Sequence, residues 1–268
     1  MDESRESGLL APERRSRILE LVRRNKSVLV KDLCTKFGVT GETIRKDLSS
    51  LEQEGLLIKT YGGAYVKDGV KNEIDASIRE TLFTEAKEAI GRACAELIGS
   101  GDTIFLDEST TCLAIARQLL NFDGITVVTN SLKISKTLAE RGSCKLILSG
   151  GDLDRKNQCF VGGSAEEFLS RYYVDKSFVS CRGMDRIAGI SDGSSVNGRI
   201  RSLMLRQGRE RFLVLDYTKV NQVNFFKICD FTSIDILVID TLPGQEWRDF
   251  LQEQEIRVIE TIPKSDNI

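Results

Sequence analysis

The chain of 268 residues contains no histidine. A protein without histidine cannot build a Ser-His-Asp or Cys-His catalytic triad. It also lacks the commonest protein ligand of zinc. We therefore expect no catalytic site of these kinds, no metal site and no bound cofactor.

Long apolar runs are absent as well. No window approaches the ~18 consecutive apolar residues of a membrane-spanning helix. The opening stretch MDESRESGLLAPERR lacks the apolar core of a signal peptide. We expect a cytoplasmic protein without a membrane partner.

The seven cysteines are odd in number, widely spaced and free of any C-x-x-C pair. This pattern argues against a disulfide framework and against structural zinc, and it predicts buried thiols. One alternative stays open, because Cys181 stands beside Arg182 and a basic neighbour can activate a thiol for redox sensing.

The length suggests two domains, and charge is divided unevenly along the chain. Residues 11–66 hold 11 Lys and Arg against 7 Asp and Glu, a net charge of +4, whereas the whole chain carries −2. The remainder, −6 by difference, is acidic. A basic segment on an acidic body indicates binding of nucleic acid.

Three short helices are predicted in the basic segment. Apolar residues at three- and four-residue spacing predict a helix from Pro12 to about Asn25. A second begins near Val30, and a tight turn at residues 38–41 separates it from a third, for which Thr40 is the N-cap. This order is typical of a helix-turn-helix.

The third helix has one apolar face, formed by Ile44, Leu48 and Leu51, and a polar face opposite it. A recognition helix enters the major groove with its N-terminal residues. The residues that we predict to reach DNA from this helix are Thr40, Glu42, Thr43, Arg45, Lys46 and Ser49.

Two short strands follow the third helix. Residues 56–61 and 64–66 are typical of two short strands around Gly62 and Gly63, where glycine permits a hairpin turn. They predict a wing, with Lys59 and Tyr61 beside the DNA backbone. The basic residues alone also fit an ordinary solvated helix face, but the turn, the helix faces and the wing agree on DNA binding.

The body of the chain alternates helical patterns with β-branched runs. Residues 67–79 are polar and predict a linker, after which 80–268 form one domain. Strands are predicted at 103–106, 125–129, 145–148, 177–180, 212–215, 236–239 and 257–259, and helices at about 80–99, from 111, and at 132–141. Such alternation predicts an open, mostly parallel α/β sheet, which binds ligands outside the carboxyl ends of its strands.

Polar residues collect where the first three of these strands end, at 107–111, 129–131 and 149–151. The first two stretches also open helices, whose free N–H groups favour a phosphate. Any one of them is also explained as a simple helix cap. Three in succession favour a binding site.

The run VTGETIRKDLSSLEQEGLLIKTYGGA resembles the N-terminal domain of the DeoR family of bacterial transcriptional regulators. That family shows a Ser/Thr-x-x-Thr-Ile-Arg-Arg-Asp-Leu motif, then Leu-Glu and a Gly-Gly-Ala wing. Thr40, Thr43, Arg45 and Lys46 fall on the motif. Lys46 replaces the second Arg, and Tyr61 stands where His is common, so bidentate contact with guanine is weakened.

The body resembles the effector domain of the same family, whose fold is similar to ribose-phosphate isomerases and CoA transferases. The resemblance implies a sensor for a phosphorylated sugar or related metabolite. The residues that it places at the effector are Asp107, Ser109, Thr110, Thr111, Thr129, Asn130, Ser131, Gly150, Gly151, Asp185 and Lys219. Ser109 stands where the family has Gly, and Arg199 where an acidic residue is common.

We therefore expect a repressor of sugar-metabolism genes that binds double-stranded operator DNA as a dimer or tetramer. A phosphorylated sugar would modulate its affinity for the operator. The alternative is an isomerase-like or acyl-transferase-like enzyme with an accessory DNA-binding head. Its acid and base groups would come from Asp107, Glu108, Asp185 and Lys219.

Overall fold

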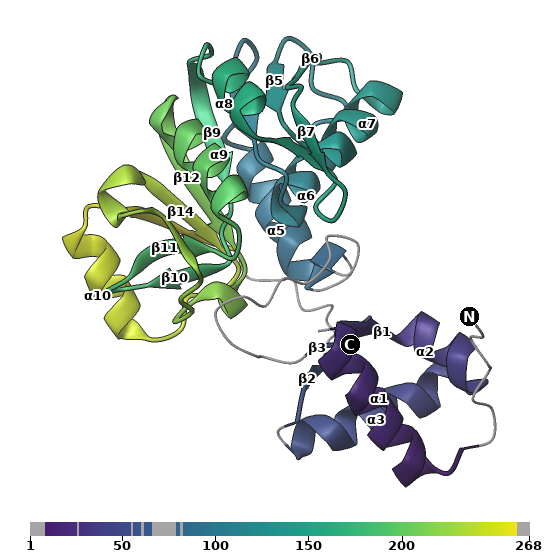
Figure 1. Ribbon diagram of the computed structural model, residues 1–268. Coiled ribbons are helices and arrows are strands. Elements are labelled where there is room, and N and C mark those ends of the chain that lie inside the picture. The colour runs from purple at the N-terminus through teal and green to yellow at the C-terminus, as the bar shows by residue number, and fades with distance from the viewer. Residues whose placement is uncertain are drawn as a thin grey trace. The chain divides into compact units, whose positions relative to one another are not determined.

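The computed structural model describes residues 9–25, 27–54, 56–59, 62–65, 79–80 and 83–261. The chain divides into two compact units, Met1–Phe83 and Thr84–Ile268. Figure 1 traces the elements of both. Except for Arg79, the predicted linker lies outside the described residues.

The N-terminal unit is a small helical domain with a three-stranded sheet. Its elements are α1 (Ala11–Asn25), β1 (Ser27–Leu29), α2 (Val30–Phe37), α3 (Gly41–Gln53), β2 (Ile58–Lys59) and β3 (Gly63–Tyr65). The three helices confirm the predicted ones. Ile18, Leu33, Phe37, Ile44 and Leu48 are buried together between them, so the predicted apolar face of α3 is its core face.

Two residues, Gly38 and Thr40, shape the turn between α2 and α3. Gly38 ends α2 in the left-handed conformation, with φ of 65°, which glycine adopts at no steric cost. Thr40 then caps α3, because its side chain accepts a hydrogen bond from Thr43 N over 3.3 Å. The predicted N-cap is confirmed.

The wing differs from its prediction. Gly63 is not a turn residue but the first residue of β3, and it pairs with Leu29 of β1. A Cβ atom at Gly63 would lie 2.0 Å from the carbonyl oxygen of Val28, so glycine is required for close approach of two backbones. The sheet order is β1-β3-β2. Three-residue β1 was not predicted, because so short a strand shows no alternation.

The C-terminal unit is built on a seven-stranded sheet in the order β15-β14-β12-β9-β4-β5-β6. Every neighbouring pair is parallel, which confirms the prediction. The strands are β4 (Thr103–Leu106), β5 (Thr126–Thr129), β6 (Lys145–Leu148), β9 (Val174–Val179), β12 (Gly208–Leu215), β14 (Ile236–Ile239) and β15 (Arg257–Glu260).

Helices cover both faces of this sheet (Figure 1). They are α5 (Thr84–Ala95), α6 (Thr110–Gln118), α7 (Leu132–Arg141), α8 (Gly163–Leu169), α9 (Ser195–Arg206) and α10 (Gln245–Glu253). One buried cluster joins α5, α6 and α7 to the sheet, and a second joins α8, α9 and α10 to its other face. The result is a three-layer α/β unit.

Smaller elements that the sequence did not predict lie outside the main sheet. They are a β7–β8 hairpin (Asp152–Asp154 and Cys159–Val161), an antiparallel sheet of β10 (Gly183–Asp185), β11 (Gly189–Asp192) and β13 (Phe226–Cys229), and the short turns η1 (Tyr217–Lys219) and η2 (Phe231–Ser233).

The strand order places a topological switch point between β4 and β9. From β4 the chain builds outward through β5 to β6, and then returns to build the other half from β9. The loops that follow β4 and β9 therefore lead to opposite faces of the sheet. Ligands of open α/β folds bind in the crevice formed at such a point.

Candidate functional site

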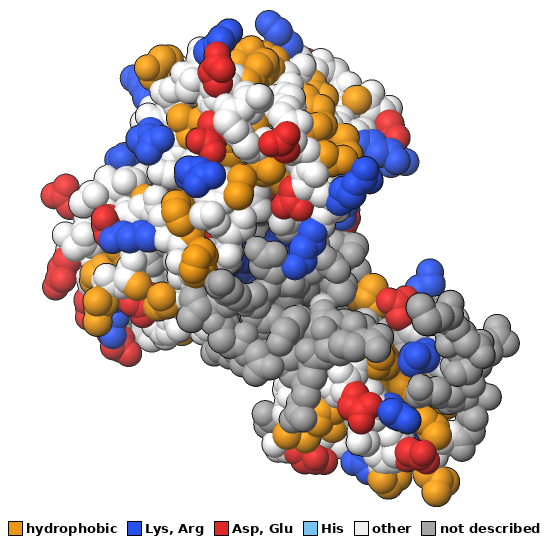
Figure 2. All heavy atoms as spheres, viewed as in Figure 1, with side chains coloured by type: hydrophobic (Ala, Val, Ile, Leu, Met, Phe, Trp, Pro, Cys, Tyr) orange, Lys and Arg blue, Asp and Glu red, His pale blue; other side chains and the backbone are white. Residues whose placement is uncertain are grey.

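The outer face of α3 carries the predicted DNA contacts. Glu42, Arg45 and Lys46 are exposed, whereas Thr43 and Ser49 are half-buried. Lys46 Nζ lies 2.9 Å from Glu42 Oε1, and this hydrogen bond and charge lower the pKa of Glu42. In the smaller unit of Figure 2, acidic and basic side chains are interspersed on the visible face.

The described part of the wing is tied to α3. Lys59 Nζ donates to Ser49 Oγ over 2.6 Å, and the backbone N–H of Lys59 donates to Glu52 Oε1 over 2.8 Å. The ammonium group thereby lies beside the middle of the predicted recognition helix. Tyr61, the other predicted wing contact, lies outside the described residues.

A buried ion pair joins α1 to α3. Arg14 Nε donates to Asp47 Oδ2 over 2.6 Å, and both side chains are buried. Sequence reasoning missed it, although Asp47 sits on the apolar face beside Leu48. A charged residue on the apolar face of a helix is the signal that would have revealed it, because a buried charge requires a partner.

In the C-terminal unit the predicted polar loops lie at one edge of the sheet, because β4, β5 and β6 are parallel neighbours. Ser109 caps α6 and Ser131 caps α7, each accepting a backbone N–H of the first turn. Thr129 Oγ1 donates to the carbonyl of Leu106 over 2.6 Å and accepts from Ser131 N over 3.0 Å. Thr129 thus ties the loop after β5 to the end of β4.

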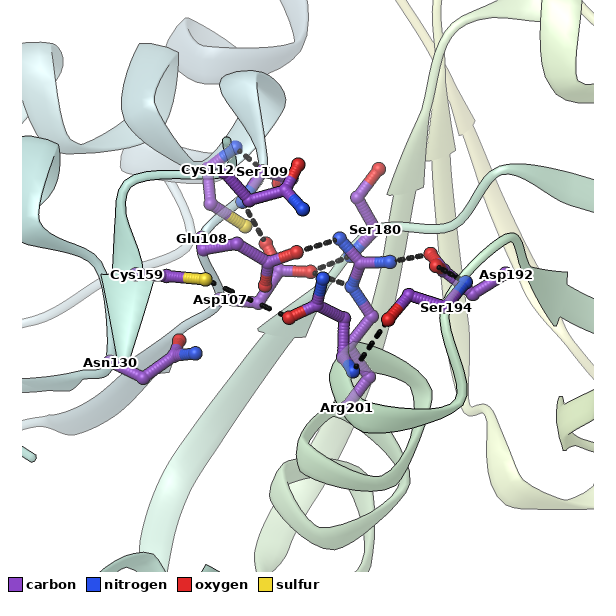
Figure 3. A network of polar contacts seen from close by, with 12 residues as sticks. Asp107, Glu108, Ser109, Cys112, Asn130, Cys159, Ser180, Asp192, Ser194 and Arg201 are labelled. Carbon is purple, nitrogen blue, oxygen red and sulfur yellow. Dashed lines mark hydrogen bonds and ion pairs between the residues drawn. The ribbon is translucent and has the colours of Figure 1, made fainter. Parts of the chain in front are cut away.

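Arg201 of α9 is the centre of a buried ionic network at this edge (Figure 3). Its Nε donates to Asp107 Oδ2 over 2.8 Å, and its two Nη atoms pair with Glu108 and Asp192. Arg201 is 1% exposed and Asp107 is fully buried. Neither Arg201 nor Asp192 was predicted as a site residue, whereas Glu108 belongs to the predicted polar loop at 107–111.

The network is charged despite its burial. Burial raises the pKa of Asp107, but Arg201 and hydrogen bonds from the loop outweigh it and hold the pKa below its ordinary value. Two of these bonds are 2.9 Å long and come from the backbone N–H groups of Ser109 and Ser180. Three acidic side chains therefore surround one guanidinium.

The other predicted effector residues also follow the carboxyl ends of strands of the main sheet, β4, β6 and β12. Lys219 of η1 donates to Thr218 Oγ1 over 2.9 Å and lies 3.6 Å from Asp216 Oδ2. Thr110 and Thr111 form the buried first turn of α6, and Gly150 and Gly151 follow β6.

Asp185 has a local partner instead of a place in the network. Its carboxylate accepts the backbone N–H groups of Ile187 and Ala188, at 2.9 Å and 2.8 Å, and so closes the turn between β10 and β11. This is a structural role typical of Asp in tight turns. Arg199, which departs from the family pattern, pairs with Glu166 on the surface over 3.0 Å.

The cysteines are free thiols. Burial raises the pKa of Cys181 to about 12, although Arg201 and Lys219 act in the opposite direction. A thiol with a raised pKa is not an activated nucleophile. Within the described part of the chain, no three side chains are grouped as a metal site requires, and no helix is long and apolar enough to cross a membrane.

Comparison with known proteins agrees with this architecture. Residues 14–69 match the DeoR-like helix-turn-helix domain, and residues 82–241, more than half of the chain, match the DeoR C terminal sensor domain. The chain belongs to the DeoR family. It is a DNA-binding transcriptional regulator with a sensor domain, and not an enzyme.

Curated relatives span nearly the whole chain. The chain is 31% identical to the HTH-type transcriptional repressor GlcR of Bacillus subtilis (strain 168), over 93% of this chain and 96% of the relative. It is 28% identical to the glycerol-3-phosphate regulon repressor of Escherichia coli (strain K12), over 92% and 97%. Among solved structures, ribose 5-phosphate isomerase A from Methanocaldococcus jannaschii covers 50% of this chain and 53% of its own, with 13% identity and a TM-score of 0.37.

Proposed function

We propose that this regulator represses genes of sugar metabolism by binding double-stranded operator DNA, and that a phosphorylated sugar or related metabolite modulates its affinity for the operator. The relatives support the proposal, because GlcR is named a transcriptional repressor and the Escherichia coli protein is named for a glycerol-3-phosphate regulon.

The proposed DNA contacts are the outer face of α3 and the wing. Arg45 and Lys46 are exposed there. Lys59 of the wing joins this face of α3 by its hydrogen bond to Ser49. Cationic groups in this position neutralise phosphates while the start of the helix reaches base edges. The full proposed set is Thr40, Glu42, Thr43, Arg45, Lys46, Ser49, Lys59 and Tyr61.

The observation that carries the sensor proposal is the convergence of two capped helix starts at one edge of the sheet. Ser109 and Ser131 place the first turns of α6 and α7 beside adjacent strand ends. Helix starts favour an anionic group. Lys219 is the cation that we propose as the partner of the phosphate.

The test pairs two titrations. Operator affinity is measured by fluorescence anisotropy with and without each of several phosphorylated sugars, and sugar-phosphate affinity by calorimetry with and without operator DNA. If the sugar lowers operator affinity tenfold, operator must lower sugar affinity tenfold, because coupling is reciprocal. Absence of any response to the panel would refute the sensor proposal.

The Lys219→Ala variant tests whether Lys219 belongs to the effector site. It should weaken binding of the sugar phosphate and leave effector-free operator binding unchanged, because Lys219 belongs to the sensor unit. Lys227→Ala is the matched control, since Lys227 is an exposed lysine of the same unit that pairs with Asp230. Equal effects of the two substitutions would remove Lys219 from the site.

We further propose a homodimer or larger assembly. A single small head recognises too short a sequence to be selective in a genome, so two heads on paired half-sites are expected. Sedimentation of the intact protein with and without operator DNA tests this. A monomer in both experiments would contradict it.

A further inference from the structure

Two buried polar atoms at the carboxyl ends of β5 and β6 have no hydrogen-bond partner among the described residues. They are Oδ1 of Asn130 and Oγ of Ser149. Asn130 is fully buried and Ser149 is 1% exposed. An unpaired buried polar group is destabilising, and such groups are rare in native proteins and call for an explanation.

The two residues are neighbours across the sheet. Thr129 is in register with Leu148, and Ser149 N donates to the carbonyl of Thr129 over 2.9 Å. The residues that follow this pair therefore point to the same face. The next residue, Gly150, is exposed, and a Cβ atom added to it would meet nothing within 4 Å.

The orientation of the amide is set by β8. Asn130 Nδ2 donates to the carbonyl of Phe160 over 3.0 Å, so Oδ1 is the atom left to accept a further hydrogen bond. In Figure 3 the amide of Asn130 is directed to the side on which Glu108 and Cys159 lie. An acceptor next to an unpaired hydroxyl is a site for a group that donates hydrogen bonds.

The hydrogen-bonding character of Asn130 Oδ1 disfavours a phosphate at this position. The amide donates to Phe160 through Nδ2, so only its acceptor is left unpaired. Phosphate oxygens are themselves acceptors, whereas a hydroxyl or amino group can donate a hydrogen bond to Oδ1. The carbon skeleton of a sugar phosphate therefore suits this position better than its phosphate.

We propose that the Asn130–Ser149 pair binds a hydroxyl or amino group on the carbon skeleton of the effector, with Asn130 Oδ1 as acceptor. The phosphate then lies toward the first turn of α6 and Lys219. This inference rests on the proposed function and refines it. The carboxyl ends of β5 and β6 then contact the carbon skeleton and not the phosphate, and they distinguish one sugar from another.

The experiment compares Ser149→Ala with Ser177→Ala. Ser177 is also fully buried with an unpartnered Oγ, but it lies within β9, away from the carboxyl edge. Neither substitution removes an intramolecular hydrogen bond found in the described residues, so both variants should be as stable as the wild type. Urea unfolding followed by fluorescence of Trp247, the single tryptophan, checks this.

Binding is measured for glucose 6-phosphate, fructose 6-phosphate, glucosamine 6-phosphate, glycerol 3-phosphate and inorganic phosphate, using calorimetry and ligand-dependent melting temperature. Ser149→Ala should weaken binding of the best sugar phosphate about five- to tenfold, the loss expected for one buried hydrogen bond. It should leave the binding of inorganic phosphate unchanged. Ser177→Ala should change neither.

The outcomes separate this inference from the function on which it rests. If Ser149→Ala binds every sugar phosphate as tightly as wild type, the inference is overturned and the sensor proposal stands. An equal loss of inorganic phosphate would overturn it too, because the pair would then hold the phosphate. If wild type binds none of the probes, both the sensor proposal and the inference fail.

Discussion

Arg201 Nε donates a hydrogen bond to Asp107 Oδ2 across 2.8 Å, and the two residues are 94 positions apart in the chain. The bond joins α9 to the loop after β4, at the switch point of the sheet. The same guanidinium also pairs with Glu108 and Asp192. One side chain therefore holds together the elements that border the proposed effector site.

Removing this guanidinium should destabilise the sensor unit strongly. Arg201→Met would leave three buried carboxylates without their cation, and breaking a buried ion pair by removing one partner costs about 3–5 kcal/mol. Urea unfolding followed by Trp247 fluorescence measures the free energy of unfolding of this unit, because Trp247 is the single tryptophan and lies in α10.

The control for this prediction is Arg199→Met. Arg199 lies two residues earlier in α9, and its pair with Glu166 is exposed, so its removal should change stability by less than about 1 kcal/mol. A similar small change for Arg201→Met would show that the buried network does not stabilise the unit.

The stability of the sensor unit should fall in acid. The pKa of Asp107 is lowered in the folded protein, so its contribution is complete above the pKa of the unfolded chain and is lost as pH falls through the folded pKa. With an unfolded pKa of about 3.9, the loss is expected below about pH 4. Urea midpoints of wild type over pH 3 to 7 measure it.

In the Arg201→Met variant, ionised Asp107 should destabilise the folded sensor unit instead of stabilising it. Without the guanidinium, burial raises the pKa of Asp107, and the buried carboxylate is relieved when it is protonated. The difference in stability between wild type and the variant should therefore begin to shrink above about pH 4, where Asp107 of the variant takes up its proton, and shrink further below it, where the wild type loses stability. A constant difference across the whole range would show that Asp107 does not respond to Arg201.

On the DNA-binding unit, Glu42→Gln should strengthen binding to operator DNA several-fold at low salt. The exposed carboxylate engages Lys46 at 2.9 Å and is the one acidic group in the proposed DNA-contacting set. Its removal frees the ammonium group and removes a repulsion. The gain should diminish as salt screens it.

Glu20→Gln is the matched control for Glu42→Gln. Glu20 is an exposed residue of α1 that pairs with Arg17 at 3.0 Å. Anisotropy titrations of both variants over a range of salt concentrations provide the measurement. Equal gains would mean that net charge alone sets the affinity, and no gain for Glu42→Gln would place the first turn of α3 away from the DNA.

Lys59 of the wing should contribute to operator affinity through its charge alone. Lys59→Ala is expected to reduce the slope of log affinity against log salt by about 0.9, the counterion release of one phosphate contact. Lys145→Ala, at the start of β6 in the sensor unit, should leave the slope unchanged, since Lys145 is exposed but belongs to the other unit. An unchanged slope for Lys59→Ala would contradict a backbone contact.

Much of the fold could be predicted from local pattern. The limits of β4, β6, α7 and β14 agree with the predicted ranges, because each is a continuous run of one periodicity between polar breaks. The cap at Thr40 follows the same logic, since a helix start needs a side-chain acceptor within three residues. Alternation of these elements was enough to predict a parallel sheet.

The sequence by itself determined the two modules, the faces of α3 and the edge at which polar loops meet, since these depend on the spacing of residues close in the chain. Only the tertiary structure decided the partners of buried charges. Arg14 meets Asp47 and Arg201 meets Asp107 because separate elements pack together, and no periodicity encodes a contact between distant positions. The charge of the site therefore became visible only in the folded chain.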